Sequence, residues 1–249
     1  MIILNFGDFV SEYLKALRQT FSVGLLQIVG VIFVYSLVFF LLSFIEDKIF
    51  QSKHDNDVAQ SVLHWLFSPI LISSVVVVVK QGLPGLTEIR KFLPGLLALG
   101  VLWCLSHWLL VYLSSTTLSY FFGLRDSYSS LEDFAQDLGS VMMRGMVVGV
   151  IISAVNGIIM SFFITLFTLG TTILISGERG VLACLQLALS FIFTNILPLV
   201  VFWAVFAVFI VLIGFVVGLL TFGLGLIIFA SLVFVSLAIF FSNLAEAII

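Results

Sequence analysis

The chain has 249 residues, of which 62% are hydrophobic and only 9% are charged. Its mean hydropathy of +1.31 lies outside the range of water-soluble domains and is typical of proteins whose helices cross a membrane several times. The net charge of −3 is spread over short polar segments, which excludes the basic surface that nucleic-acid binding requires. We therefore expect an all-α polytopic transmembrane bundle of about six spans, with interfacial amphipathic helices, in a single membrane domain over residues 1–249.

The first predicted element is an interfacial helix over residues 1–21, because apolar side chains recur there at helical spacing. Asp8, Glu12, Lys15 and Arg18 take its other side. The first span follows at about 22–44. The second, at 62–79, contains Pro69 and is short. The basic loop 80–91 then leads into a third span at about 92–114.

A polar connection begins at Gly123, and Ser129 with Glu132 matches the capping box that starts a helix. The spacing of apolar residues from Leu131 onward predicts a second interfacial helix. The fourth span, at 145–175, is longer than a bilayer needs, so we expect it to tilt, protrude or bend near Asn156 and Gly157.

Residues 180–244 contain no Lys, Arg, Asp, Glu or His, so we expect their solvent to be lipid. Pro198 cannot continue a helical hydrogen-bond ladder, which places a boundary just after Asn195. We expect an interfacial or half-buried helix at 181–193, a fifth span at 197–219, a turn at 220–223 and a sixth span at 224–244.

The distribution of basic residues predicts the orientation, since positively charged loops stay in the cytoplasm. An inner N-terminus puts six of the ten basic residues inside and leaves Lys48, Lys53, Arg125 and Arg144 outside. We therefore expect both termini in the cytoplasm.

The segment 175–244 reads ISGERGVLACLQLALSFIFTNILPLVVFWAVF and then FGLGLIIFASLVFVSLAIFF. It resembles the C-terminal half of the YciC-like group of bacterial inner-membrane proteins and neighbouring six-helix families. The positions that carry this resemblance are Gly180, Ala183, Ser190, Asn195, Gly223 and Gly225. The resemblance implies a six-helix protein of a bacterial inner membrane, without an assigned activity.

Three polar residues at predicted membrane depth are candidate functional positions. His107 is the only ionisable residue deep in a span, and Cys104 lies one turn before it, so a haem or metal ligand and a hydrogen-bonded interhelical histidine both remain open. Asn156 and Asn195 must have partners, either as links between helices or in a substrate site.

The sequence lacks the signatures of nucleophilic, ATP-dependent and metalloprotease catalysis, so we expect no enzyme, no catalytic residues, no metal and no cofactor. The spacings Gly145–Gly149 and Gly214–Gly218 allow close helix packing.

The first functional hypothesis is a subunit or assembly factor whose partners are the lipid bilayer and other membrane proteins or further copies of the chain. A small-molecule or lipid transporter that uses polar helix breaks near Asn156 and Asn195 is the alternative, and a haem- or metal-binding protein that uses His107 is the third.

Overall fold

The computed structural model describes residues 3–22, 62–122, 131–177, 180–221 and 224–249, with scattered positions between 30 and 44. Every regular element in these ranges is helical, which confirms the all-α prediction. Most of the predicted first span, at 22–44, lies outside the described residues. By their contacts the residues form two compact units, one of Met1–Cys104 with Ile164–Ile249 and the other of Leu105–Phe163.

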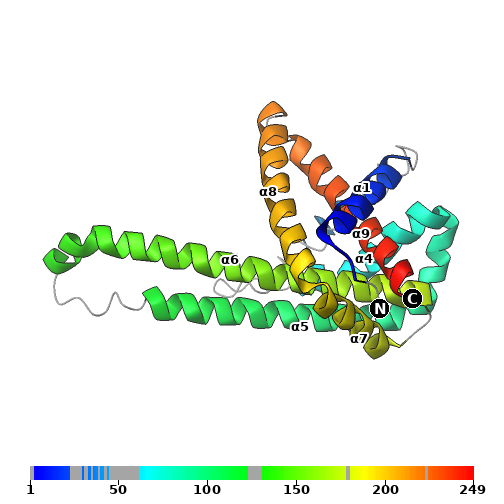
Figure 1. Ribbon diagram of the computed structural model, residues 1–249, viewed down its shortest axis with the longest axis horizontal. Coiled ribbons are helices and arrows are strands. Elements are labelled where there is room, and N and C mark those ends of the chain that lie inside the picture. Colours follow the sequence, from blue (N-terminus) through cyan, green and yellow to red (C-terminus); the bar gives the residue numbers. More distant parts are fainter. Residues whose placement is uncertain are drawn as a thin grey trace. The chain divides into compact units, whose positions relative to one another are not determined.

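The helices of the described part carry the labels of Figure 1. In chain order they are α1 (Phe6–Ser22), α4 (Val62–Gln81), the short 3-10 helix η1 (Leu83–Glu88), α5 (Ile89–Phe122), α6 (Leu131–Gly177), α7 (Val181–Thr194), α8 (Ile196–Leu220) and α9 (Leu224–Ile248).

Four segments of the described residues are helical, long and apolar enough to cross a membrane. They are Leu83–Leu113, Ala154–Gly177, Ile196–Leu220 and Ile228–Ile248. The described parts of α4 and α7 are shorter apolar helices. The third to sixth predicted spans thus have helical counterparts, while the total of six stays a prediction.

One predicted boundary agrees with the structure and another is wrong. The third span is predicted to end at about residue 114, and the membrane-length apolar segment ends at Leu113, while α5 itself continues through the hydroxyl-rich residues to Phe122. The second interfacial helix and the fourth span are one element, since α6 runs for 47 residues without interruption. Neither Gly145 nor Gly157 ends the helix, as single glycines cost only about 1 kcal/mol within a helix.

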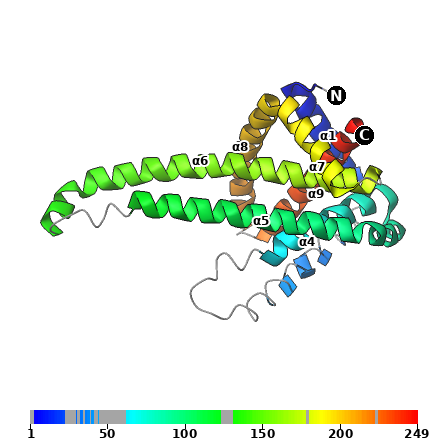
Figure 2. The same ribbon diagram turned by 90° about the horizontal axis from the view of Figure 1, so that it is seen from below.

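Helix α1 begins at a reciprocal cap. The Asp8 backbone N–H donates to Asn5 Oδ1 (3.0 Å), and the Asn5 N–H donates to Asp8 Oδ2 (2.8 Å). The helix then runs along α9 in the same direction, because Tyr13 contacts Ser236 and Gln19 contacts Asn243 (Figures 1 and 2).

Part of the apolar side of α1 is covered by protein. Phe9 and Ala16 are fully buried, whereas Leu14 and Phe21 stay about half exposed. The ring of Phe9 lies 5.9–6.2 Å from the rings of Phe191, Phe202 and Phe240. The amphipathic pattern of α1 is therefore satisfied in part by packing on the C-terminal helices, and its position at the membrane interface stays a prediction.

In the α8–α9 hairpin, Gly214 and Gly218 face α9, and an added Cβ at either would make ordinary van der Waals contact. A Cβ on Gly214 would lie 3.5 Å from the Phe229 ring, and one on Gly218 would lie 3.4 Å from Leu226. The turn begins with Thr221, whose Oγ1 donates to the Val217 carbonyl (2.6 Å) and accepts from the Gly225 N–H (2.8 Å). The Gly214–Gly218 spacing therefore serves packing within the chain.

Helices α4 and α5 meet at a backbone contact. A Cβ on Gly100 would lie 2.0 Å from the carbonyl oxygen of Leu66, in the turn before Pro69. Nearby, the Trp103 ring stacks on Phe167 of α6 at 5.4 Å and lies 5.2 Å from the Trp65 ring. This contact is possible only because Gly100 has no side chain, since any Cβ there would overlap the carbonyl group.

Candidate functional site

Asn195 lies at the turn between α7 and α8 and is fully buried. Its Oδ1 accepts from the backbone N–H of Leu4 (2.7 Å), and its Nδ2 donates to the Phe191 carbonyl (3.0 Å). The predicted boundary after Asn195 is confirmed. The expectation that this amide has partners is confirmed as well, and these partners belong to the protein itself.

His107 lies on α5, one turn after Cys104. Both side chains are partly exposed, and Cys104 is a free thiol. Among the described residues, no group of three or more His, Cys, Asp or Glu side chains is placed to hold a metal ion. The haem or metal hypothesis for His107 stays a prediction from the sequence.

Asn156 lies on α6, where the helix continues without a break. The expected helix break near Asn156 is therefore wrong, because the neighbouring Gly157 keeps the helical conformation. Asn156 and His107 belong to the unit Leu105–Phe163, whereas Asn195 belongs to the other unit.

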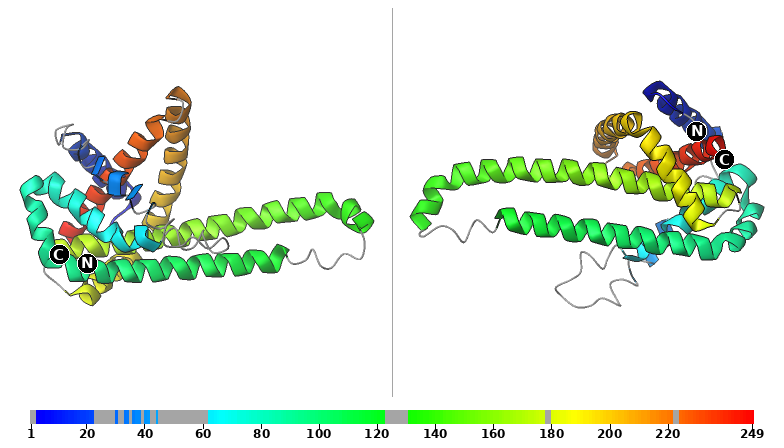
Figure 3. Two further views of the ribbon diagram at one scale, coloured as in Figure 1. Left: turned by 180° about the vertical axis from the view of Figure 1, so that it is seen from behind. Right: turned by 60° about the horizontal axis from the view of Figure 1, so that its bottom comes forward.

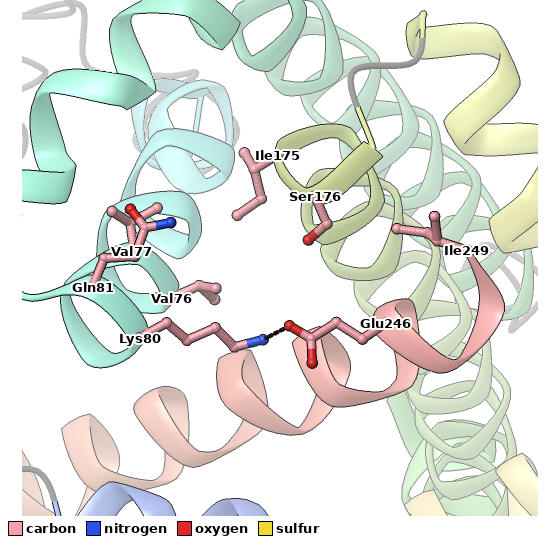
Figure 4. Close-up of a pocket in the computed structure, with 8 residues that line it drawn as sticks. All are labelled: Val76, Val77, Lys80, Gln81, Ile175, Ser176, Glu246 and Ile249. Carbon is pink, nitrogen blue, oxygen red and sulfur yellow. Dashed lines mark hydrogen bonds and ion pairs between the residues drawn. The ribbon is translucent and has the colours of Figure 1, made fainter.

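A pocket of about 400 Å³ opens where α4, α6 and α9 end (Figure 4). All three helices reach it with their last turns, and Figure 3 shows the C-terminus of the chain beside the end of α6. Half of the lining residues are apolar, two are charged and two are uncharged and polar. The lining residues are Val76, Val77, Lys80, Gln81, Ile175, Ser176, Glu246 and Ile249.

The two charges of the pocket form an ion pair. Lys80 Nζ donates to Glu246 Oε1, and the two side chains are 29% and 58% exposed. A partly exposed pair of this kind contributes little to stability, about 0–1 kcal/mol. The ion pair therefore matters more as a pair of charges that a ligand in the pocket could meet than as a source of stability.

Comparison with protein families, curated proteins and solved structures finds no match for this chain. The resemblance of residues 175–244 to the YciC-like group accordingly stays a prediction. The functional argument is thus built on the geometry of the chain itself.

A second hollow, of about 370 Å³, lies against the last turns of α6 where α5 and α7 begin. Its wall is formed by Lys91, Phe92, Pro94, Gly95, Leu174, Gly180 and Val181. Gly95 brings α5 close to α6 here, because a Cβ on it would lie 2.9 Å from Leu174. Residues near 91, 175, 180 and 249 therefore gather at one end of α6.

The sequence analysis did not find the pairing of Lys80 with Glu246. One signal was present, since Glu246 is the only charged side chain after Arg179. An acidic group at the end of a long apolar stretch marks a helix end, where a basic partner can reach it. Which of the ten basic residues reaches it depends on helix packing, which spacing along the chain does not contain.

Proposed function

We propose that this chain is a non-enzymatic subunit or assembly factor of a larger complex in a bacterial inner membrane. The observation that carries the proposal is the exposure of α8. Only 11% of its most apolar 18-residue segment is buried within the chain, against 56% for α6 and α9. Apolar surface on this scale needs either lipid or a neighbouring protein helix.

The exposed side chains of α8 form one continuous face, which we call the outer α8 face. Val205, Val208, Leu212, Phe215 and Leu219 are each more than half exposed. At 100° per residue they share one arc of the helix, centred about 120° from the direction of Gly214 and Gly218, which pack against α9. Helix α8 thus has one face for the fold and one for a neighbour.

Polar groups in the described C-terminal helices are used to hold the chain together, which favours a structural role over a substrate path. Trp203 Nε1 donates to Thr165 Oγ1 (2.9 Å) and thereby links α8 to α6. The Tyr13 and Ser236 hydroxyls lie 3.0 Å apart and link α1 to α9. Coupled transport instead needs polar or ionisable groups that change partners between two states.

The proposed orientation has both termini in the cytoplasm. It is supported by the gathering of residues near 80, 176 and 249 around one pocket. Because Gly180 also lies at that end of α6, the chain between Gly180 and Ile249 makes an even number of crossings. Two crossings, by α8 and α9, agree with a half-buried α7.

Photo-crosslinking from the outer α8 face tests the proposal. A photoreactive residue is placed at Val208, Leu212 or Phe215 in cells, and the adducts are separated by mass. We expect discrete protein adducts, while a probe at the buried Phe206 should react only within the chain. Adducts with lipid alone at all three outer positions would contradict the proposal.

The alternative is a small-molecule or lipid transporter, and the observation in its favour is the helix break at Asn195. The purified chain is reconstituted alone in liposomes with an imposed proton or sodium gradient. The subunit proposal expects no accumulation of candidate solutes. Gradient-driven accumulation that disappears in Asn195→Ala would establish the alternative instead.

A further inference from the structure

We propose that the pocket at the ends of α4, α6 and α9 binds the headgroup of a zwitterionic phospholipid of the phosphoethanolamine class. The lipid phosphate would lie against Lys80 and its ammonium group against Glu246. This inference concerns a binding site that the proposed function does not require, and it stands independently of the partners of α8.

The position of the pocket along the spanning helices matches the level at which lipid headgroups lie. Ser176 and Glu246 lie in the last turns of two segments that are long enough to span the bilayer, Ala154–Gly177 and Ile228–Ile248. The ends of membrane-spanning helices lie at the polar region on either side of the hydrocarbon core. A molecule that enters this pocket therefore comes from the headgroup layer.

The ion pair leaves bonding capacity for a ligand that carries both charges. An ammonium group has three donors and a carboxylate has several acceptor sites, and the bond between Lys80 and Glu246 uses one of each. A phosphate oxygen can accept from the remaining Lys80 donors, while a ligand ammonium donates to Glu246. The adjacent charges of the pocket thus mirror the adjacent charges of the headgroup.

The C-terminal ends of three helices determine which phospholipid headgroup the pocket favours. The last turns of α4, α6 and α9 all border the pocket, and Lys80 is the only basic residue in them. The negative ends of the helix dipoles and Glu246 favour a ligand cation there. An anionic glycerol headgroup lacks that cation, and a choline headgroup lacks the N–H donors. Ethanolamine satisfies both requirements.

The rest of the wall fits the less polar part of a lipid. Val76, Val77, Ile175 and Ile249 line the pocket beside the charges, as Figure 4 shows. The volume of about 400 Å³ falls within the usual range of small-ligand pockets. The glycerol backbone and the first methylene groups can therefore lie against these apolar side chains.

The test is native mass spectrometry of the full chain titrated with phosphatidylethanolamine, phosphatidylglycerol or phosphatidylcholine of identical acyl chains. We expect phosphatidylethanolamine to bind about tenfold more tightly than either of the others, as a charge-assisted hydrogen bond permits. Lys80→Met should weaken this binding about tenfold. Glu246→Gln should remove the preference for ethanolamine over glycerol.

The matched controls are Lys15→Met and Glu12→Gln, which alter an exposed ion pair on α1 with an N–O distance of 3.5 Å. They should leave all three affinities unchanged. Should Lys80→Met fail to fold, Lys80→Arg keeps the cation and should retain ethanolamine binding within about threefold. Equal binding of the three lipids, preference for phosphatidylglycerol, or unchanged selectivity in Glu246→Gln would each overturn the proposal.

Discussion

The backbone N–H of Leu4 donates to the side-chain oxygen of Asn195 at 2.7 Å, across 191 positions of sequence. This bond fixes the segment before α1 to the junction of α7 and α8. Because α1 also packs along α9, the start of the chain is held by elements near its end. Asn195 is therefore a structural junction between distant segments.

Asn195→Leu should destabilise the chain by about 1–3 kcal/mol, since it leaves the part-buried Leu4 N–H and the buried Phe191 carbonyl without the partners that Asn195 supplies. Reversible unfolding in mixed micelles with increasing dodecyl sulfate measures the loss. Asn243→Leu is the matched control, because its amide is less buried and bonds only a side chain, Gln19 Oε1, at 3.0 Å. We expect a loss of about 0.5–1.5 kcal/mol there. Equal losses would contradict the junction role of Asn195.

Gly100→Ala should be among the most damaging single-methyl changes in the described chain. The new Cβ would overlap the Leu66 carbonyl, and relief requires α4 and α5 to separate. Such overpacking costs typically 1–3 kcal/mol or more. Gly157→Ala is the control, since nothing lies within 4 Å of its Cβ position. It should raise the free energy of unfolding by up to about 1 kcal/mol. A stable Gly100→Ala variant would show that α4 and α5 lie further apart.

The helices of the C-terminal half could be predicted closely because their signals are local. Pro198 marks the start of α8, and the lack of charge in residues 180–244 marks its membrane character. The amphipathic pattern of α1 predicted a helix but not its partner. An apolar stripe matches lipid and a protein surface equally well, and only the structure shows that the Phe9 ring packs against the Phe240 ring.

The long helix α6 shows where local signals fail. Ser129 and Glu132 predict a helix start, and α6 begins at Leu131 as expected. The predicted separation of this helix from the fourth span is wrong, because α6 passes through Gly139 and Gly145 without a break. Apolar helix formers on both sides outweigh one glycine. The pocket could not be predicted from local signals either, since Lys80, Ser176 and Glu246 come together only when three helices pack.

Tyr13 should make stability fall at alkaline pH. Burial raises the pKa of its phenol above the ordinary value of 10.0, while the hydrogen bond to Ser236 lowers it by a smaller amount. The unfolded state then loses the proton first, so stability is complete below pH 10.0 and falls as the pH rises through the higher folded-state pKa. Unfolding measured from about pH 9 to 11 should show this fall in the wild type and a smaller one in Tyr13→Phe. Parallel curves would contradict the burial of this phenol.

Cysteine labelling tests the orientation. In a chain whose Cys104 and Cys184 are replaced, single cysteines at Gln81 and Gly177 should resist a membrane-impermeant thiol reagent in intact cells. Both should react after the membrane is permeabilised. A cysteine at Ser52, in the loop predicted to be external, should react in either case. Labelling of Gln81 and Gly177 in intact cells would invert the proposed topology, and different results for the two would contradict their common position at one end of α6.

The central claim, that this chain works among other membrane proteins, is tested most directly by the mass of the particle it forms in its native membrane. The full chain is extracted with its surrounding lipid by a polymer that needs no detergent, and the protein mass and composition of the particle are measured. We predict a particle heavier than the 27.5 kDa chain, with another protein or further copies at a fixed ratio in repeated preparations. A particle that holds one 27.5 kDa chain and lipid alone would contradict the account.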